Sequence, residues 1–164
     1  MAKKVIVDLD LSRCVACYAC VVACKDQHYD VDEQGPAFRK ALRYENDEGV
    51  IKCISIGCMH CADSPCMAAC PTGAIYRDEE TGLVQVDSSS RIGCRSCQMA
   101  CPFGAPKLTA ENRRVKCDGC AERIKQGLEP VCVKTCPSGA LFLREQNEHN
   151  RTDSLRRRVF GDEL

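Results

Sequence analysis

Cysteine is the residue type whose number and spacing in this chain could do chemistry. Sixteen cysteines occur among 164 residues, and fifteen of them fall into four runs. The runs are Cys14, Cys17, Cys20 and Cys24; Cys58, Cys61, Cys66 and Cys70; Cys94, Cys97 and Cys101; and Cys117, Cys120, Cys132 and Cys136. Cysteine sulfurs are ligands of zinc and of iron-sulfur clusters, so the pattern predicts metal binding.

The spacing within the runs favours [4Fe-4S] clusters. Three closely spaced cysteines can turn their sulfurs toward one centre. The last cysteine of a run lies about one helical turn further on, and in two-cluster ferredoxins it ligates the neighbouring cluster. Pro71 and Pro137 follow the last cysteine of their runs, and a glycine two residues later permits a sharp turn. Residues 71–75 and 137–141 therefore form an internal repeat, and the runs predict paired clusters.

Two other uses of cysteine are weaker alternatives. Structural zinc is usually held by two separated cysteine pairs rather than by triplets that end in Cys-Pro, and a zinc-bound interaction module would be colourless. Disulfides fit poorly because cysteines two residues apart in a helical turn bridge badly, and the chain shows no export signal.

Short secondary-structure elements must position these cysteines. Residues 5–8 are predicted to be a strand that leads into the first cysteine loop, and residues 18–28 a helix behind it that continues through Lys25. Residues 74–76 and 83–87 are predicted to form a hairpin, and residues 121–126 a short helix that ends at Gly127. Aromatic residues make up only 5% of the chain and tryptophan is absent, so folding should be coupled to metal assembly.

Composition and the N-terminus limit the class of protein. The formal net charge is zero, which gives no support to nucleic-acid binding. The first ten residues lack the unbroken apolar stretch of a secretory signal, so we expect a cytoplasmic protein, unless a partner with its own signal exports it folded. No window approaches the ~20 apolar residues of a membrane helix, so no direct membrane insertion is expected. No signature of a catalytic or phosphate-binding site is present, so catalysis is expected to belong to another subunit.

With these motifs in hand, the chain resembles the four-cluster, polyferredoxin-like iron-sulfur subunits of the DMSO reductase family. The resemblance covers about residues 5–144 and is most specific at residues 58–66 (CMHCADSPC), 92–95 (IGCR), 100–106 (ACPFGAP) and 116–120 (KCDGC). It implies an α+β fold of two ferredoxin-like units related by a pseudo-twofold axis, the second inserted into the first. Residues 1–46 and 107–145 would form the first unit, residues 47–106 the inserted unit, and residues 146–164 a basic C-terminal tail.

The resemblance also implies four sets of cluster ligands. They are Cys14, Cys17, Cys20 and Cys136 for cluster 1; Cys117, Cys120, Cys132 and Cys24 for cluster 2; Cys58, Cys61, Cys66 and Cys101 for cluster 3; and Cys94, Cys97 and Cys70 for cluster 4.

Cluster 4 departs from the family pattern, because Arg91 stands where the family has the remaining cysteine. A guanidinium cannot be deprotonated in a protein and does not normally ligate iron. The site could hold a [3Fe-4S] cluster, hold a [4Fe-4S] cluster with a ligand other than cysteine, or be empty with Arg91 filling part of the void. Cys53 could serve as a replacement ligand, but its alternating surroundings favour a small buried hydrophobe.

Two features outside the cysteine runs have competing interpretations. His60 lies between two predicted ligands and could donate a hydrogen bond to a cluster sulfur, but a solvated or partner-facing histidine is favoured. The tail is expected to be solvated or disordered, with a docking arm as the rival interpretation.

The resemblance implies a non-catalytic electron-transfer subunit. Its partner would be a large catalytic redox subunit that carries molybdenum- or tungsten-pterin, such as an aldehyde oxidoreductase, a formate or carbon dioxide reductase, or an aromatic-ring reductase. A further electron-donor or acceptor subunit could take part. A subunit of a hydrogenase or carbon monoxide dehydrogenase is one alternative, and a free-standing ferredoxin-like carrier is another.

Overall fold

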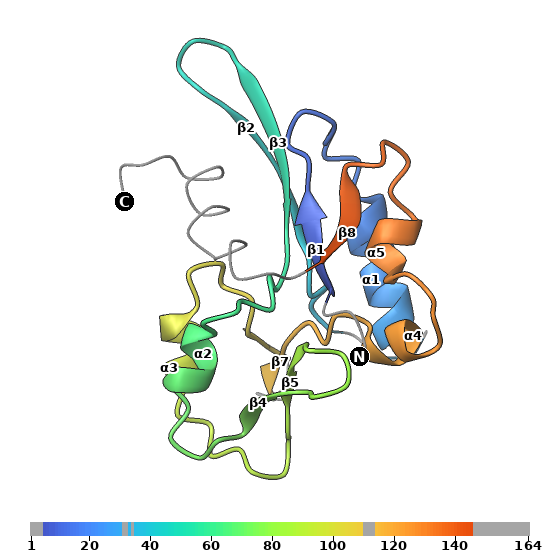
Figure 1. The fold of residues 1–164 in the computed structure, drawn as a ribbon. Coiled ribbons are helices and arrows are strands. Elements are labelled where there is room, and N and C mark those ends of the chain that lie inside the picture. Colours follow the sequence, from blue (N-terminus) through green and yellow to red (C-terminus); the bar gives the residue numbers. More distant parts are fainter. Residues whose placement is uncertain (1–4, 31–32, 34, 110–113, 146–164) are drawn as a thin grey trace.

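The computed structural model describes residues 5–30, 33, 35–109 and 114–145, and within them the fold mixes short helices with two-stranded antiparallel sheets (Figure 1). The predicted tail, residues 146–164, lies outside the described residues. The helices are α1 (Ala19–His28), α2 (Pro65–Ala68), α3 (Ser96–Ala100), α4 (Ala121–Lys125) and α5 (Val131–Lys134). The strands are β1 (Val5–Leu9), β2 (Lys40–Glu45), β3 (Ile51–Ile56), β4 (Ile75–Arg77), β5 (Val84–Val86), β6 (Lys107–Leu108), β7 (Arg114–Val115) and β8 (Leu141–Glu145).

Strands from opposite ends of the described chain pair with each other. β1 and β8 are antiparallel, in a register that runs from Val5 opposite Glu145 to Leu9 opposite Leu141. Their inward side chains form a small core with Ala140 and with two cysteines, Cys20 and Cys132. α1 packs against α5, which in turn contacts β8. The predicted strand at residues 5–8 is confirmed, and the core gains much of its apolar surface from cysteine.

A second group of elements lies at the other end of the molecule, where α2 packs against α3 close to β4 (Figure 1). β4 and β5 form the predicted hairpin, with Ile75 opposite Val86. The backbone N–H of Asp78 donates to the oxygen of Leu83 at 2.9 Å and closes the turn. Leu83 and Val84 are fully buried, so this hairpin anchors the second group.

The β2–β3 hairpin extends away from both groups (Figure 1). The side chain of Asn46 accepts hydrogen bonds from the backbone N–H groups of Glu48 and Val50 and shapes its turn. Residue pairs run from Lys40 opposite Ile56 to Glu45 opposite Ile51, so the predicted boundary between residues 46 and 47 falls within the turn.

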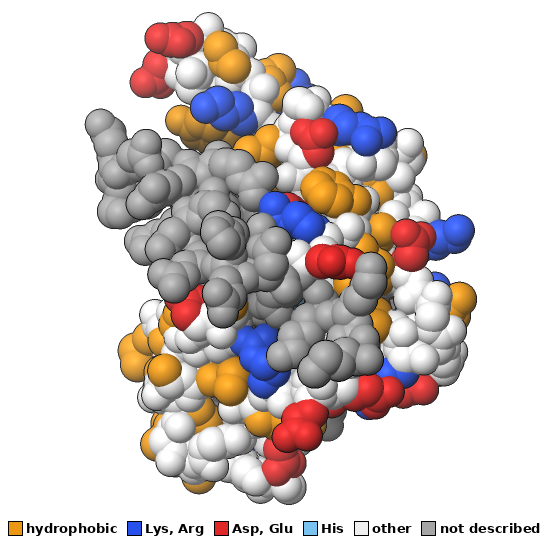
Figure 2. Space-filling model, viewed as in Figure 1, with side chains coloured by type: hydrophobic (Ala, Val, Ile, Leu, Met, Phe, Trp, Pro, Cys, Tyr) orange, Lys and Arg blue, Asp and Glu red, His pale blue; other side chains and the backbone are white. Residues whose placement is uncertain are grey.

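The helices around the cysteine runs agree with the sequence predictions. α1 continues through Lys25, and α4 ends just before Gly127, whose φ of 76° is left-handed. Hydrophobic, basic and acidic side chains are interspersed on the face seen in Figure 2. None of the helices in the described ranges is long and apolar enough to cross a membrane.

Candidate metal centres

The four cysteine loops share one backbone turn. The residue two positions after the first cysteine of a loop has a left-handed φ: 52° at Ala16, 44° at His60 and 72° at Gly119. Gly93, two residues after Arg91, has a φ of 74°. This conformation costs an L-residue about 1–2 kcal/mol. Its recurrence at non-glycine positions indicates that the shape of the loop, rather than residue preference, imposes it. The loop that begins with Arg91 thus keeps the turn of the loops that begin with cysteine.

A second left-handed residue immediately precedes four of the five helices. Tyr18, Ser64, Arg95 and Cys120 have φ values of 65°, 31°, 66° and 52° before α1, α2, α3 and α4. Sequence reasoning missed these turns because glycine, the usual signal for a positive φ, is absent from all four positions.

The first predicted site is a cavity beside α1. Its lining includes Cys14, Cys17 and Cys20 from the first loop, together with Cys136 from the segment after α5. Burial would raise the pKa of Cys136, but backbone N–H groups at Leu141, Ala140 and Ser138 and the hydroxyl of Ser138 lower it below its ordinary value. The cavity therefore brings together the four cysteines that were predicted to share cluster 1.

Cys70 has the same surroundings as Cys136. Backbone N–H groups at Ile75, Thr72 and Ala74 stand at matching positions after Cys70 and, with the hydroxyl of Thr72, lower its pKa against the effect of burial. Gly73 and Gly139 have φ values of 67° and 60°. The repeat seen in the sequence is thus a repeat of hydrogen-bond donors around a sulfur.

A second cavity lies beside α2 and is lined by Cys58, Cys61, Cys66 and Cys101, the predicted ligands of cluster 3. Burial, with Cys58 close by, raises the pKa of Cys66 to about 11. The backbone N–H of Ala105 donates to the sulfur of Cys101 at 3.4 Å. Metal ligation requires the thiolate, so loading this site must release protons.

The predicted ligands of cluster 2 lie where α1 and α5 meet the fourth cysteine loop. Cys24 and Cys132 come from the two helices and are close enough to influence each other's charge, while Cys120 lies near Cys117 and Cys132. Burial, with Asp118 and the neighbouring thiols, raises the pKa of Cys120 to about 12. The backbone N–H of Gly119 donates to the sulfur of Cys117 at 3.4 Å.

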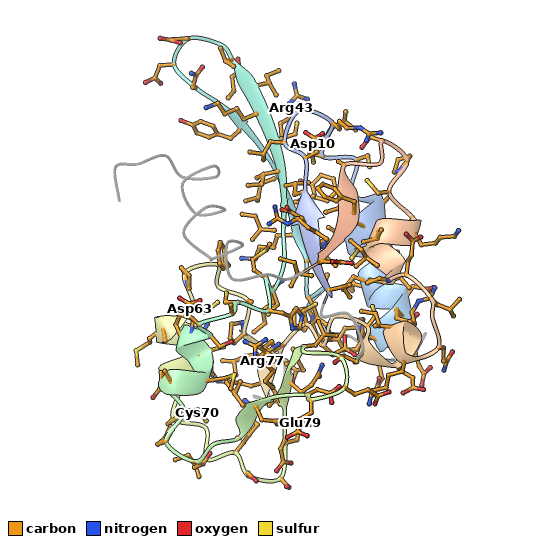
Figure 3. All side chains as sticks on the ribbon, viewed as in Figure 1. Asp10, Arg43, Asp63, Cys70, Arg77 and Glu79 are labelled. Atoms are coloured by element: carbon orange, nitrogen blue, oxygen red, sulfur yellow. The ribbon has the colours of Figure 1, made fainter. Side chains whose placement is uncertain are left out.

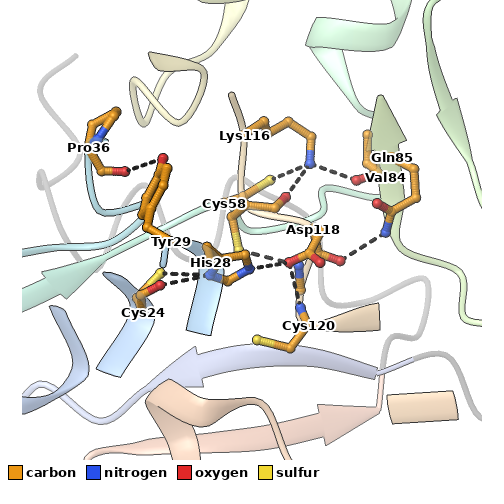
Figure 4. A network of polar contacts seen from close by, with 12 residues as sticks. Cys24, His28, Tyr29, Pro36, Cys58, Val84, Gln85, Lys116, Asp118 and Cys120 are labelled. Atoms are coloured by element: carbon orange, nitrogen blue, oxygen red, sulfur yellow. Dashed lines mark hydrogen bonds and ion pairs between the residues drawn. The ribbon is translucent and has the colours of Figure 1, made fainter. Parts of the chain in front are cut away.

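A contact between His28 and Asp118 links α1 to the fourth cysteine loop (Figure 4). The Nε2 of His28 lies 3.1 Å from Oδ1 of Asp118, which also accepts the backbone N–H of Cys120 at 2.8 Å. Burial would lower the pKa of His28, but the hydrogen bond with Asp118 raises it to about 10. Sequence reasoning missed this pair, because residues 90 positions apart carry no local signal of contact.

A further cavity, called the fourth cavity because it lies at the site predicted for cluster 4, is lined by three cysteines and two arginines, namely Cys70, Cys94, Cys97, Arg91 and Arg114, among other residues. The guanidinium of Arg91 donates through Nη1 to the backbone oxygen of Arg114. Arg91 therefore lines this cavity while its guanidinium binds the backbone of Arg114.

Cys53 lies elsewhere. It is on β3, opposite Arg43, partly buried and close enough to Cys14 to raise the pKa of that thiol beyond the effect of burial. Cys70 of the fourth cavity lies beside α2, far from Arg43 on the hairpin (Figure 3). Cys53 is not among the residues that line the fourth cavity.

Comparison with known proteins places these loops in a family. Residues 49–146 match the family described as 4Fe-4S dicluster domain. The chain is 42% identical over 147 residues to the probable anaerobic dimethyl sulfoxide reductase chain YnfG of Escherichia coli, covering 81% of this chain and 69% of that protein. The chain belongs to the 4Fe-4S dicluster domain family.

Two further relatives of this chain are named as subunits of other enzymes. The thiosulfate reductase electron transfer subunit PhsB of Salmonella typhi is 41% identical over 145 residues, covering 85% of this chain and 74% of PhsB. The iron-sulfur subunit of the nitrate-inducible formate dehydrogenase of Escherichia coli is 37% identical over 158 residues, covering 85% of this chain and 54% of that subunit. The resemblance seen in the sequence is confirmed, and these names agree with a subunit that is not itself catalytic.

The groups of cysteine sulfurs in this chain fit the [4Fe-4S] cofactor of its family. All sixteen cysteines lie in the described ranges and all are free thiols, so none is used in a disulfide. Four sulfurs gather at each of the sites predicted for clusters 1, 2 and 3, and backbone N–H groups approach sulfurs at all three. Cysteine sulfur is the usual ligand of such clusters, and hydrogen bonds to sulfur tune them.

The favoured prediction for His60 was wrong. The side chain is only 2% exposed, and its Nδ1 accepts the backbone N–H of Val84 at 2.9 Å. This hydrogen bond leaves the ring proton on Nε2, and the imidazole lies beside the thiols of Cys58 and Cys117. Burial would raise the pKa of Cys58, but the nearby His60 and the ammonium group of Lys116 lower it below its ordinary value. The alternative, a hydrogen bond from His60 to a cluster sulfur, stays a prediction, and the buried imidazole beside Cys58 and Cys117 is compatible with it.

Proposed function

We propose that the protein is an electron-transfer subunit that passes electrons through a row of iron-sulfur clusters to or from a larger redox enzyme in the cytoplasm. The observation that carries the proposal is the repetition of one left-handed turn in four cysteine loops, three of which contribute cysteines to cavities lined by cysteines from another run. The names of the relatives support it, since they belong to reductases and a formate dehydrogenase. An iron-sulfur cluster supplies reversible one-electron transfer.

Each cluster would be held by cysteines from two loops. The proposed sets are Cys14, Cys17, Cys20 and Cys136; Cys117, Cys120, Cys132 and Cys24; Cys58, Cys61, Cys66 and Cys101; and Cys70, Cys94 and Cys97. This exchange of ligands ties the loops together in pairs, as paired ferredoxin clusters require.

We further propose the inserted arrangement of two ferredoxin-like units, with residues 1–46 and 107–145 as the first and 47–106 as the second. The pairing of β1 with β8 supports it, because it joins the two ends of the first unit around everything between them. The contact of α1 with α5 and that of α2 with α3 support it as well, since each helix pair lies within one proposed unit.

At the fourth site we propose a [3Fe-4S] cluster. Three cysteines line an open cavity, and Arg91 uses its guanidinium to bind the oxygen of Arg114. A three-iron cluster needs only three thiolates and omits the iron that the arginine cannot ligate. The whole protein would then hold about fifteen iron atoms, against about twelve for three [4Fe-4S] clusters alone.

The first and fourth proposed sites have exposed apolar residues in their linings, which suits partner contact. Val15 and Tyr18 line the first site beside Cys17 and are exposed, and the exposed Ile92 lines the fourth site. Cys17 and Cys94 are themselves exposed. We propose that a large molybdenum- or tungsten-pterin subunit docks over one rim, while a further donor or acceptor subunit uses the other.

Anaerobic purification from the native host tests this function. We expect broad visible absorption that bleaches on reduction with dithionite, about fifteen irons per chain, and co-purification with a large redox subunit that reduces or oxidises the clusters. A colourless, iron-free protein would overturn the proposal. An iron-loaded chain that never associates with a larger subunit would instead identify a free-standing carrier.

A further inference from the structure

Three basic side chains are buried among the cysteine loops. Arg39, Lys116 and Arg114 are 5%, 9% and 8% exposed. Within the described ranges, the ion pairs of the protein involve His28, Lys125 and Arg144 with acidic partners, and none involves these three buried cations. A buried charge is costly unless an opposite charge or a full set of hydrogen bonds compensates for it.

Lys116 contacts Cys58, a proposed ligand of the third cluster, and lies next in sequence to Cys117, a proposed ligand of the second (Figure 4). Its Nζ donates to the sulfur of Cys58 at 3.4 Å and to the backbone oxygens of Val84 and Cys117 at 2.6 Å each. These three acceptors match the three N–H donors of an ammonium group. The cation therefore contacts a ligand of one cluster directly and the backbone of a ligand of the next.

Arg39 has the corresponding place between the first and second clusters. Its Nη1 donates to Oγ of Ser55 at 3.2 Å, and that oxygen lies 3.2 Å from the sulfur of Cys20. Burial raises the pKa of Cys132, while Arg39, which hydrogen-bonds to that thiol, opposes the rise. The missing side chain of Gly57 gives the guanidinium room, because a Cβ there would lie 3.1 Å from Nη2 of Arg39.

Arg114 borders the fourth cavity. Its Nη1 donates to Oε1 of Gln98 at 2.8 Å, which fixes the guanidinium. Its Nη2 is buried and has no hydrogen-bond partner among the described residues. The same side chain lines the cavity with Cys97 and Arg91. An N–H donor of Arg114 that lacks a hydrogen-bond acceptor among the described residues therefore belongs to a cavity lined by thiols.

We propose that Arg39, Lys116 and Arg114 compensate the negative charge of the clusters beside them and set the reduction potentials of those clusters. This inference rests on the proposed electron-transfer function. Each one-electron reduction takes an electron from the donor and adds one negative charge to a cluster, so a nearby buried cation stabilises the reduced form and raises the potential. Arg39 and Lys116 each act on two clusters, and Arg114 acts on the fourth site alone.

The test is a dithionite titration of the iron-loaded protein followed by paramagnetic resonance. Lys116→Met removes the charge and shortens the unbranched side chain by one atom, whereas Lys116→Arg keeps the charge. For Lys116→Met, we expect the reduced-to-oxidised ratio at a fixed potential to fall about tenfold at two clusters, a shift of ~59 mV for a one-electron couple. The other clusters should keep their potentials, and Lys116→Arg should restore most of the shift.

Lys25→Met is the matched control. Lys25 follows a proposed ligand, Cys24, but its side chain is exposed, so solvent and salt screen its charge and the potentials should stay unchanged. Arg39→Met and Arg39→Lys repeat the comparison between the proposed first and second clusters. Similar shifts of potential in the Lys116 and Arg39 variants would show that charge, rather than the shape of one side chain, sets the potentials.

Each outcome bears on the inference. Unchanged potentials in iron-loaded Lys116→Met and Arg39→Met would overturn it while leaving the electron-transfer function intact. Cluster loss in the neutral variants, with retention in the charge-preserving ones, would support it. The same loss in all four variants would show that packing rather than charge matters and would overturn it.

Discussion

At the scale of single residues, the sharpest contrast is between the proposed ligand cysteines and Cys53. Cys58→Ser or Cys117→Ser should reduce the iron content by about four atoms, because a serine hydroxyl stays protonated where the cluster needs a thiolate. Cys53→Ala should leave the iron content unchanged, since Cys53 lies on β3 outside the lining of the fourth cavity. Iron analysis of the three anaerobically purified variants makes the comparison. Loss of a whole cluster from Cys53→Ala would show that Cys53 is a ligand.

Arg91 gives the second residue-scale prediction. The loop from Arg91 to Cys94 has the same left-handed turn as the loop from Cys14 to Cys17, so a cysteine at position 91 should reach the site without rebuilding the backbone. We expect Arg91→Cys to convert a three-iron cluster into a [4Fe-4S] cluster, with iron rising to about sixteen atoms. Paramagnetic resonance of the oxidised protein should lose the three-iron signal. The same signal in both proteins would mean that residue 91 does not face the cluster.

The groups of cysteines that line common cavities could be predicted from the sequence, because cluster ligation would dictate both residue type and spacing. The polar residues around them could not. His60, Lys116 and Arg39 are ordinary polar side chains in the sequence, and their burial follows from long-range packing, as when Val84 donates to His60 across 24 positions. Arg91 was visible only as a departure from a pattern, and the neighbouring role of Arg114 left no sequence signal.

At the scale of elements, Gly119 joins the fourth cysteine loop to the β4–β5 hairpin. Its φ is +72°, and a Cβ there would lie 2.9 Å from the methyl groups of Leu83 and 3.1 Å from Nε2 of His60. We expect Gly119→Ala to cost about 1–2 kcal/mol for the left-handed backbone and a further 1–3 kcal/mol, roughly, for displacing Leu83. The thermal midpoint of the iron-loaded protein should fall accordingly.

Gly127→Ala separates these two contributions. Gly127 has a φ of +76°, and a Cβ added there would meet nothing within 4 Å, so its substitution carries the backbone cost alone. The midpoint should fall less than for Gly119→Ala, with the iron content retained. Equal losses in the two variants would mean that the contact between Gly119 and Leu83 contributes nothing.

Helices and strands that are bounded by turn residues or that show a clear hydrophobic period could be predicted from the sequence. Elements that lack both signals could not. The β4–β5 hairpin is bounded by turn residues, and α1 continues through Lys25 as expected. β2 was missed because only Ala41 of its six residues is buried, so its sequence lacks the alternation that marks a half-buried strand. The left-handed residues before the helices were missed because their conformation follows from the loop rather than from residue type.

At the scale of the whole molecule, metal and fold should depend on each other. The core beside β1 and β8 counts Cys20 and Cys132 among its buried residues, and the chain has no tryptophan to add. Arg39, Lys116 and Arg114 are buried without a carboxylate partner among the described residues. Cluster thiolates supply the charge that compensates for these cations, so removing iron should leave both an underfilled core and unpaired buried charges.

We therefore expect removal of iron by an oxidant and a chelator to abolish the cooperative thermal transition and not merely to lower its midpoint. Circular dichroism and iron content, followed together during anaerobic titration with the chelator, should fall in parallel. Lys116→Met offers an internal check, because losing one buried cation should make the iron-free chain less unstable even as it shifts cluster potentials in the loaded protein. An iron-free chain that keeps its full cooperative transition would show that packing alone holds the fold, and that the buried cations are compensated without the clusters.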